Sequence, residues 1–328
     1  MFTRDDAVTA VENAADAATL FDTGPGLAHR RYRELAAALH PDRNPGDPRA
    51  HKAATTLNRL YTDWKNSRHQ TVTTATSAYT LIRPHAVGSI ATTYRTTGPH
   101  LVKIVRSPAL NPLIHAEWTA LRTLDDFTER HRWLRPYYPR LLDTSGPVAR
   151  GDRAFSVLEP LVDGFITLAD VRKGFPHGLD GRDYAWMHRR LLRAVAGAHR
   201  AGVVHGHLTA DNVLVHPEQH GIVLIGWSFA IEDGALPLAA DKSVQYPPEV
   251  HKGLAVTAAT DVHMLHRLML DLLAPGETRQ REFAEWCTQE DPARRPDAAD
   301  LLDEYDDLLG ELYGPRTFRP FTIPETGA

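Results

Sequence analysis

The chain has 328 residues, a formal net charge of −4, and ordinary fractions of hydrophobic (42%) and charged (24%) residues. This length accommodates two domains, and without a basic excess we expect no nucleic-acid partner. A single cysteine, Cys287, excludes an intramolecular disulfide and suits a reducing cytosol. We expect no membrane association, because no apolar run is as long as a membrane span. The first residues are acidic and lack the apolar core of a secretory signal, which predicts a cytoplasmic protein. The richness in Ala, Arg and Thr is typical of GC-rich bacterial genomes.

Residues 1–68 are rich in alanine and have helical spacing of apolar positions. A helix is predicted over Gly26–Leu39 and ends before Pro41, which cannot continue it. A polar loop follows, and a second helix is predicted over Pro48–Trp64 with Asp47 as its N-cap. The apolar stripes of these two helices predict that they pair; the stripes comprise Tyr32, Leu35, Ala36 and Leu39 in the first helix and Leu57, Leu60, Tyr61 and Trp64 in the second.

The loop between the two helices carries a motif. The run Tyr32–Pro48, which contains His40-Pro41-Asp42 and then Asn-Pro-Gly-Asp, resembles helix II and the loop of a J-domain. Leu57–Tyr61 resembles helix III of that family. The resemblance implies that Asp42 offers a carboxylate to an arginine of a DnaK-type chaperone, with His40 and Pro41 setting its geometry. It also implies that a basic helix face meets an acidic chaperone surface; this face comprises Arg30, Arg31 and Arg33. Two departures from the family are the missing paired tyrosines of helix I and the short connection Asp22–Gly26.

Composition changes after the hairpin. A Thr/Ser-rich stretch predicts a linker over residues 69–78. Short β-branched runs then precede long helical patterns, so residues 79–314 are predicted to form a strand-rich lobe followed by a helical lobe. Residues 315–328 are rich in Pro and Thr and are predicted to be an extended or disordered tail. The predicted fold class is therefore α+β, with a helical hairpin followed by a bilobal domain.

Motifs within residues 79–314 resemble those of protein kinases, in the same order. Lys103 resembles the strand lysine that binds nucleotide phosphates, Glu117 its helical glutamate partner, and Glu159 the hinge. Five later runs resemble, in chain order, the catalytic loop, the metal-binding Asp-Phe-Gly turn, the Ala-Pro-Glu motif, the start of helix F and a late arginine motif. In the same order, these runs are Val203–Val215, Gly221–Ala230, Tyr246–Glu249, Thr260–Val262 and Asp291–Pro296. The resemblance implies structural roles for His205, Glu249, Asp261 and Arg295, with Glu249 and Arg295 forming a buried ion pair.

The residues that carry kinase chemistry are changed. Phosphoryl transfer needs a carboxylate to orient the attacking hydroxyl, and carboxylate and amide ligands for magnesium. His207 stands at the catalytic aspartate position and Gly226 at the metal-binding aspartate position, whereas Asn212 is retained. We therefore expect no strong magnesium site. In the glycine-rich loop only Gly88 remains. His205 and His207 lack the cysteines or carboxylates that would complete a metal site, so none is predicted.

Small-molecule kinases of the aminoglycoside phosphotransferase type are also similar here, but both aspartates are missing in that alignment too. We therefore predict a pseudokinase without catalytic residues, joined to a J-domain-like hairpin that recruits a DnaK-type chaperone, with a protein client or regulator as a further partner. Two alternatives remain open. One is an unorthodox ATP-dependent phosphotransferase using His207, Asp211 and Asn212; the other is a binding scaffold with an inert hairpin. ATP is a possible ligand, and its predicted contacts are Gly88, Lys103, Glu117, Glu159 and Asn212.

Overall fold

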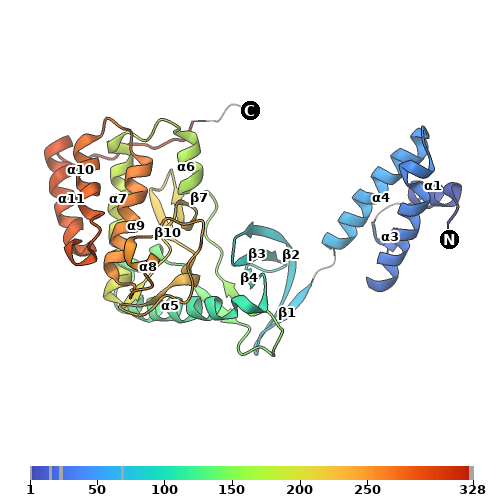
Figure 1. The fold of residues 1–328 in the computed structure, drawn as a ribbon, viewed down its shortest axis with the longest axis horizontal. Coiled ribbons are helices and arrows are strands. Elements are labelled where there is room, and N and C mark those ends of the chain that lie inside the picture. The colour runs from blue at the N-terminus through green and yellow to red at the C-terminus, as the bar shows by residue number, and fades with distance from the viewer. Residues whose placement is uncertain (1, 15–16, 22–24, 68–69, 325–328) are drawn as a thin grey trace. The chain divides into compact units, whose positions relative to one another are not determined.

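The computed structural model describes residues 2–14, 17–21, 25–67 and 70–324 (Figure 1). The chain divides into two compact units. The first comprises Met1–His85 and Tyr94–Gly98, and the second comprises Ala86–Thr93 and Pro99–Ala328. No helix among the described residues is both long and apolar enough to cross a membrane.

Helices make up most of the first unit (Figure 1, blue), and their bounds are α1 Arg4–Glu12, α2 Ala17–Phe21, α3 Pro25–Leu39 and α4 Pro48–Ser67. The helices α3 and α4 start within a residue of the predicted positions. Asp47 caps α4, since its Oδ1 atom accepts hydrogen bonds from the amides of Arg49 (3.0 Å) and Ala50 (3.1 Å). The predicted stripes face the core of this unit: Leu35, Leu39 and Leu57 are at most 1% exposed. Part of the short connection Asp22–Gly26 lies outside the described residues.

The stretch predicted as a linker forms a β-hairpin where it is described. β1 (Thr71–Thr73) pairs antiparallel with β2 (Ala78–Val87), in the register Val72 to Tyr79. The turn between them is closed by Thr74, whose amide donates to the carbonyl oxygen of Ser77 at 2.9 Å. Threonine is a favourable strand residue because its β-branched side chain suits the pleated backbone. Composition alone therefore misassigned residues 71–78.

Strands of the second unit carry the candidate site. β4 (Leu101–Val105) pairs antiparallel with β6 (Phe155–Leu158), which also pairs with β5 (Leu141–Thr144). The helix α5 (Asn111–Arg130) packs its buried face near these strands, and Trp118 donates from Nε1 to Ser156 Oγ at 2.9 Å. The remaining strands are β3 Ala91–Thr96, β7 Ile166–Thr167, β8 Val203–Val204, β9 Val213–His216, β10 Gly221–Leu224 and β11 Ile231–Glu232.

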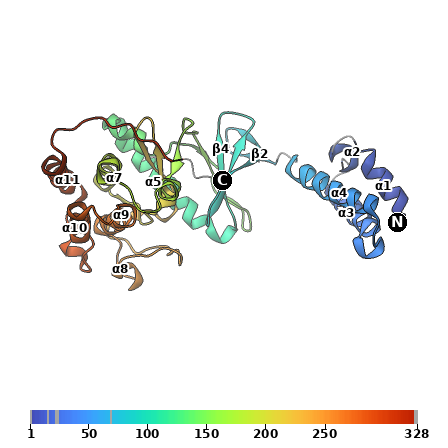
Figure 2. The same cartoon turned by 90° about the horizontal axis from the view of Figure 1, so that it is seen from above.

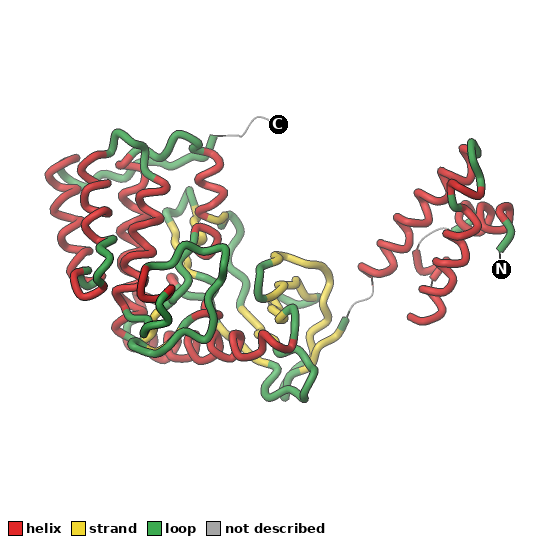
Figure 3. Tube along the Cα trace, viewed as in Figure 1, coloured by secondary structure: helices red, strands yellow, loops and turns green. Residues whose placement is uncertain are grey.

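Helices dominate the rest of the second unit (Figure 3, red), with bounds α6 Leu168–Gly174, α7 Gly181–Arg200, α8 Pro248–His251, α9 Ala258–Leu272, α10 Thr278–Cys287 and α11 Ala298–Tyr313. The helix α7 is central: it packs on α9 and on α11, and α10 packs on α9 (Figures 1 and 2). Beyond α11, residues 315–324 are extended but ordered against the helices. Phe321 is 4% exposed and stacks on Phe175 with ring centroids 5.6 Å apart. The alternative of a disordered tail is therefore wrong for these residues.

Candidate functional site

Lys103 on β4 and Glu117 on α5 form an ion pair, and the Glu117 side chain is only 3% exposed. Two serines complete its hydrogen bonding. Ser228 Oγ donates to Glu117 Oε2 at 3.2 Å, and Ser156 Oγ donates to Glu117 Oε1 at 3.2 Å. A buried carboxylate is stable when it is paired and fully hydrogen-bonded. The structure thus brings together Lys103, the residue predicted to bind nucleotide phosphates, and Glu117, its predicted partner.

Asp261, near the start of α9, organises the loop that follows β8. Its Oδ2 atom accepts from the amide of His205 at 2.7 Å, and its Oδ1 atom accepts from the amide of Gly206 at 2.9 Å. His205 in turn is within 2.9 Å of the Ile225 carbonyl oxygen through Nε2. Gly206 has φ of +68°, and a Cβ atom there would lie 2.8 Å from the Phe229 carbonyl oxygen. The aspartate therefore shapes the loop backbone.

Asn212 and Gly226, from the two motifs that hold the metal ligands in a kinase, lie against each other. The Asn212 Nδ2 atom donates to the His207 carbonyl oxygen at 3.0 Å and lies 3.1 Å from His207 Nδ1. A Cβ atom on Gly226 would lie 2.5 Å from Asn212 Cγ and 2.8 Å from Nδ2. Gly226 also has φ of +83°, which disfavours any other residue. The amide of Asn212 thus fills the space that a side chain at position 226 would need.

His207 is 8% exposed and faces an aspartate that the sequence analysis missed. Its Nε2 atom lies 4.0 Å from Asp241 Oδ2. Burial lowers the pKa of His207 to about 4, although the Asp241 charge acts in the opposite direction. The imidazole is therefore neutral at pH 7. Asp241 also accepts a hydrogen bond from Ser89 Oγ of the glycine-rich-loop position at 3.3 Å, and one from Ser243 Oγ at 2.6 Å. The Ser243 hydrogen bonds are the main cause that lowers the pKa of Asp241.

No sequence signal points to Asp241, because it lies outside the runs that resemble kinase motifs. Only the tertiary structure brings it close to His207. Two other nucleotide-binding candidates make backbone hydrogen bonds. The amide of Gly88 donates to the Ala91 carbonyl oxygen at 2.9 Å, within its own turn. Glu159 is exposed, and its amide donates to the Arg140 carbonyl oxygen at 3.0 Å. Across the described ranges, no group of three or more His, Cys, Asp or Glu side chains is placed to hold a metal ion.

Glu249 on α8 and Arg295 form a buried bidentate ion pair. Arg295 donates to the two carboxylate oxygens at 2.6 and 3.0 Å, and Thr260 Oγ1 donates to Glu249 Oε1 at 3.0 Å. Arg295 also donates to the carbonyl oxygens of Gln289 (2.7 Å) and Ala259 (3.1 Å). Such a network ties three segments together. These residues lie together as predicted and form part of the framework of the second unit.

The loop between α3 and α4 in the first unit presents its predicted residues to solvent. The Asp42 side chain is 88% exposed, and its amide donates to His40 Nδ1 at 3.2 Å. Asn44 holds the loop, since its Nδ2 atom donates to the carbonyl oxygens of Ala38 (2.9 Å) and His40 (3.1 Å). On α3 two of the predicted contact residues, Arg30 and Arg33, are exposed, and Arg31 is half-buried. Asp42 and these arginines are therefore available to another molecule.

Comparisons with known proteins show the fold of the second unit. No family model matches the chain, and no curated protein matches it in sequence. Among solved structures, vaccinia related kinase 3 is similar with a TM-score of 0.58 and 17% identity, covering 74% of this chain and 91% of that one. Two mutant forms of the PknI kinase domain of Mycobacterium tuberculosis have TM-scores of 0.53 and 0.55 at 18% identity, covering 72% and 73% of this chain and 97% and 98% of those chains. The chain has a protein-kinase-like fold.

Proposed function

We propose that the kinase-like part is a pseudokinase that binds a protein partner without transferring phosphate. The observation that carries this proposal is the glycine at position 226, which supplies no metal-binding carboxylate and packs against the Asn212 amide. Phosphoryl transfer depends on metal ions that neutralise charge on the phosphates. The Lys103–Glu117 pair is kept, but a lysine alone cannot replace a magnesium ion.

We further propose that the hairpin α3–α4 recruits a DnaK-type chaperone, with Asp42 offering its carboxylate to an arginine of the chaperone. Three features support this: the exposure of Asp42, the loop hydrogen bonds that position it, and the exposed cations Arg30 and Arg33 on the preceding helix. Such charges increase the association rate with an acidic surface and make it sensitive to salt. The partner of the pseudokinase part would then be delivered to the chaperone.

The chaperone proposal is tested by measuring the ATPase rate of a purified DnaK-type chaperone with the full chain added. We expect stimulation by the wild type and none by Asp42→Asn, because the amide keeps the shape but loses the charge. Asp63→Asn on α4 makes the same charge change away from the loop and should stimulate as the wild type does. Equal stimulation by wild type and Asp42→Asn, or none by either, would refute chaperone recruitment.

A phosphotransferase is the second candidate function, and the Asp241 carboxylate near His207 favours it, because it returns a carboxylate to the neighbourhood of the catalytic loop. This candidate requires consumption of ATP that depends on magnesium and disappears in Lys103→Ala. The pseudokinase proposal instead expects no such consumption. It also expects magnesium to leave the melting temperature measured with ATP unchanged. The effect of a ligand would be easy to detect, because a ligand bound at 100 times its Kd stabilises the fold by about 2.7 kcal/mol.

A further inference from the structure

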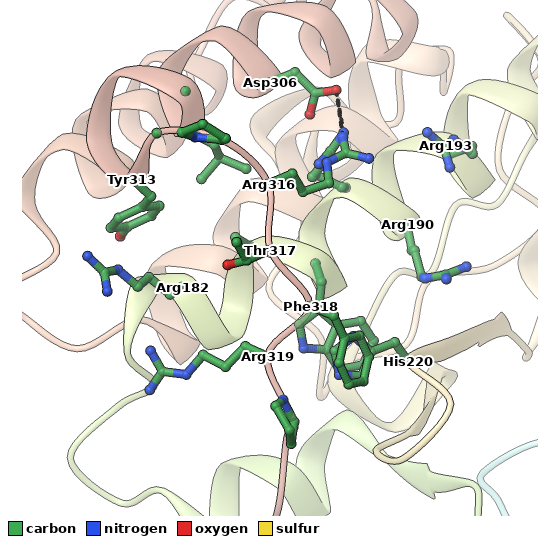
Figure 4. Close-up of a pocket in the computed structure, with 18 residues that line it drawn as sticks. Arg182, Arg190, Arg193, His220, Asp306, Tyr313, Arg316, Thr317, Phe318 and Arg319 are labelled. Carbon is green, nitrogen blue, oxygen red and sulfur yellow. Dashed lines mark hydrogen bonds and ion pairs between the residues drawn. The ribbon is translucent and has the colours of Figure 1, made fainter.

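A cavity of about 790 Å³ lies on the second unit, away from the kinase-like site. One face of α7, the turn before β10, the end of α11 and the extended segment after it line the cavity (Figure 4). Its most distinctive feature is charge, since the lining contains a single carboxylate, Asp306, and six arginines: Arg182, Arg189, Arg190, Arg193, Arg316 and Arg319.

Three of these arginines are neutralised. Arg189 and Arg316 both pair with Asp306, and Arg319 pairs with Asp183 at 2.8 Å. Among the residues that the structure describes, the other three have no carboxylate oxygen within 4.0 Å; they are Arg182, Arg190 and Arg193. Arg182 lies over the ring of Tyr313, 5.0 Å from its centroid. Six guanidinium groups around a single lining carboxylate repel each other, and an anion would relieve this repulsion.

Within the described part of the chain, three buried polar atoms of the lining lack a hydrogen-bond partner, and one of them, Asp306 Oδ1, is an acceptor. His220 is 8% exposed, and its Nε2 atom makes no hydrogen bond within the described part of the chain. The same holds for the Nε1 donor of Trp186. The two rings stack with centroids 4.1 Å apart and an interplanar angle of 6°, and His220 adopts φ of +50°. The Trp186 N–H can only donate, so a ligand that accepts hydrogen bonds would satisfy it.

Among the described residues, two of the three arginines without a carboxylate partner lie on the same side of the extended segment as His220 (Figure 4). Figure 4 shows Arg190, Arg193 and His220 on one side of the extended segment, with Arg182 and Arg319 on the other side. Arg190 and Arg193 are three residues apart on α7 and are therefore neighbours on its surface. The pKa of His220 is lowered mainly by burial and next by the charge of Arg190, as expected of a cation close to the ring. Arg190 has only a long hydrogen bond, 3.5 Å, to Tyr137 Oη.

We propose that Arg190, Arg193 and His220 bind a phosphate group. Guanidinium groups match the geometry of phosphate oxygens and donate paired hydrogen bonds to them. A phosphate is favoured over a carboxylate because its additional oxygens and second charge suit two unpaired arginines and the Trp186 N–H donor. The group belongs either to an inorganic phosphate or to a nucleotide, whose base would stack on Phe318, a residue 72% exposed beside His220.

The test is calorimetric titration of the full chain with inorganic pyrophosphate and, separately, with AMP. The double variant Arg190→Gln/Arg193→Gln should bind at least about tenfold more weakly, because two charge-assisted contacts are lost. Arg172→Gln/Arg200→Gln changes the net charge equally at exposed positions on α6 and α7 outside the lining and should bind as the wild type does. Arg190→Lys/Arg193→Lys, which keeps the charge, should bind with intermediate affinity. Circular dichroism confirms that each variant is folded.

Failure of the wild type to bind either compound would overturn the proposal, as would equal weakening in the control variant. Binding that is lost in Lys103→Ala but kept in the double variant would place the ligand at the kinase-like site and would also overturn it. If the proposal holds, Phe318→Ala separates the two sources. A loss of affinity for AMP alone identifies a nucleotide, whereas unchanged affinity for both compounds identifies an inorganic phosphate.

Discussion

Replacing Gly226 tests most directly how closely the Asn212 side chain packs against position 226. A residue with a Cβ atom at this position meets two separate costs. The first is the left-handed backbone conformation, φ +83°, which costs a non-glycine residue about 1–2 kcal/mol. The second is displacement of the Asn212 amide, which loses its two contacts with His207, at about 1 kcal/mol each. Gly226→Ala should therefore lower the free energy of unfolding by about 3–4 kcal/mol.

A matched glycine separates these two costs. Gly234 has nearly the same φ, +85°, but an added Cβ atom there meets no atom within 4 Å. Gly234→Ala should therefore cost only the conformational part, about 1–2 kcal/mol. The measurement is urea unfolding of both variants. Truncation of the neighbour provides a further check: in the Asn212→Ala background, Gly226→Ala should cost about as little as Gly234→Ala does.

Equal destabilisation by Gly226→Ala and Gly234→Ala would refute the reasoning, because it would mean that Asn212 does not fill the space at position 226. A related variant tests whether a carboxylate at position 226 would bind magnesium. Gly226→Asp restores the missing carboxylate, yet we expect it to gain no magnesium-dependent rise in melting temperature, because the new side chain displaces the Asn212 amide, the other expected metal ligand. A clear magnesium-dependent rise would contradict this expectation.

Three other substitutions test the framework. Arg295→Leu should lower stability by about 3–5 kcal/mol, because it leaves the buried Glu249 carboxylate unpaired, and the double variant with Glu249→Leu should recover part of this loss in urea unfolding. Burial lowers the pKa of His266 to about 4 from an ordinary 6.5, so below pH 6.5 the unfolded chain takes up a proton that the native chain does not. The free energy of unfolding should thus fall as the pH decreases from about 7 to about 4, with His266 contributing about 2 kcal/mol of this loss at pH 5. His266→Leu should reduce the difference in unfolding free energy between pH 7 and pH 5. An unchanged difference would show that other groups cause it. Asp47→Ala should destabilise α4 by about 1 kcal/mol through loss of its cap, seen as a lower helix signal on heating, whereas Asp63→Ala within the same helix should have little effect.

Much of this protein could be predicted from local patterns. Helix bounds at Leu39 and Pro48 follow from proline and capping chemistry, which act within a few residues. The pairs Lys103–Glu117 and Glu249–Arg295 could be proposed because their motifs occur in a fixed order along the chain, and the structure places both pairs in contact. The substitutions at His207 and Gly226 can likewise be read directly from the amino-acid sequence.

Other features depend on contacts between distant segments, and only the tertiary structure decided them. Asp241 reaches His207 through the path of the segment between β11 and α8. The extended segment after α11 is ordered because Phe321 stacks on Phe175, although the composition of this segment favours disorder. The sequence by itself showed that the side chain at position 226 is missing. The structure showed that the Asn212 amide lies where a side chain at position 226 would begin, a contact between two segments that the amino-acid sequence alone does not reveal.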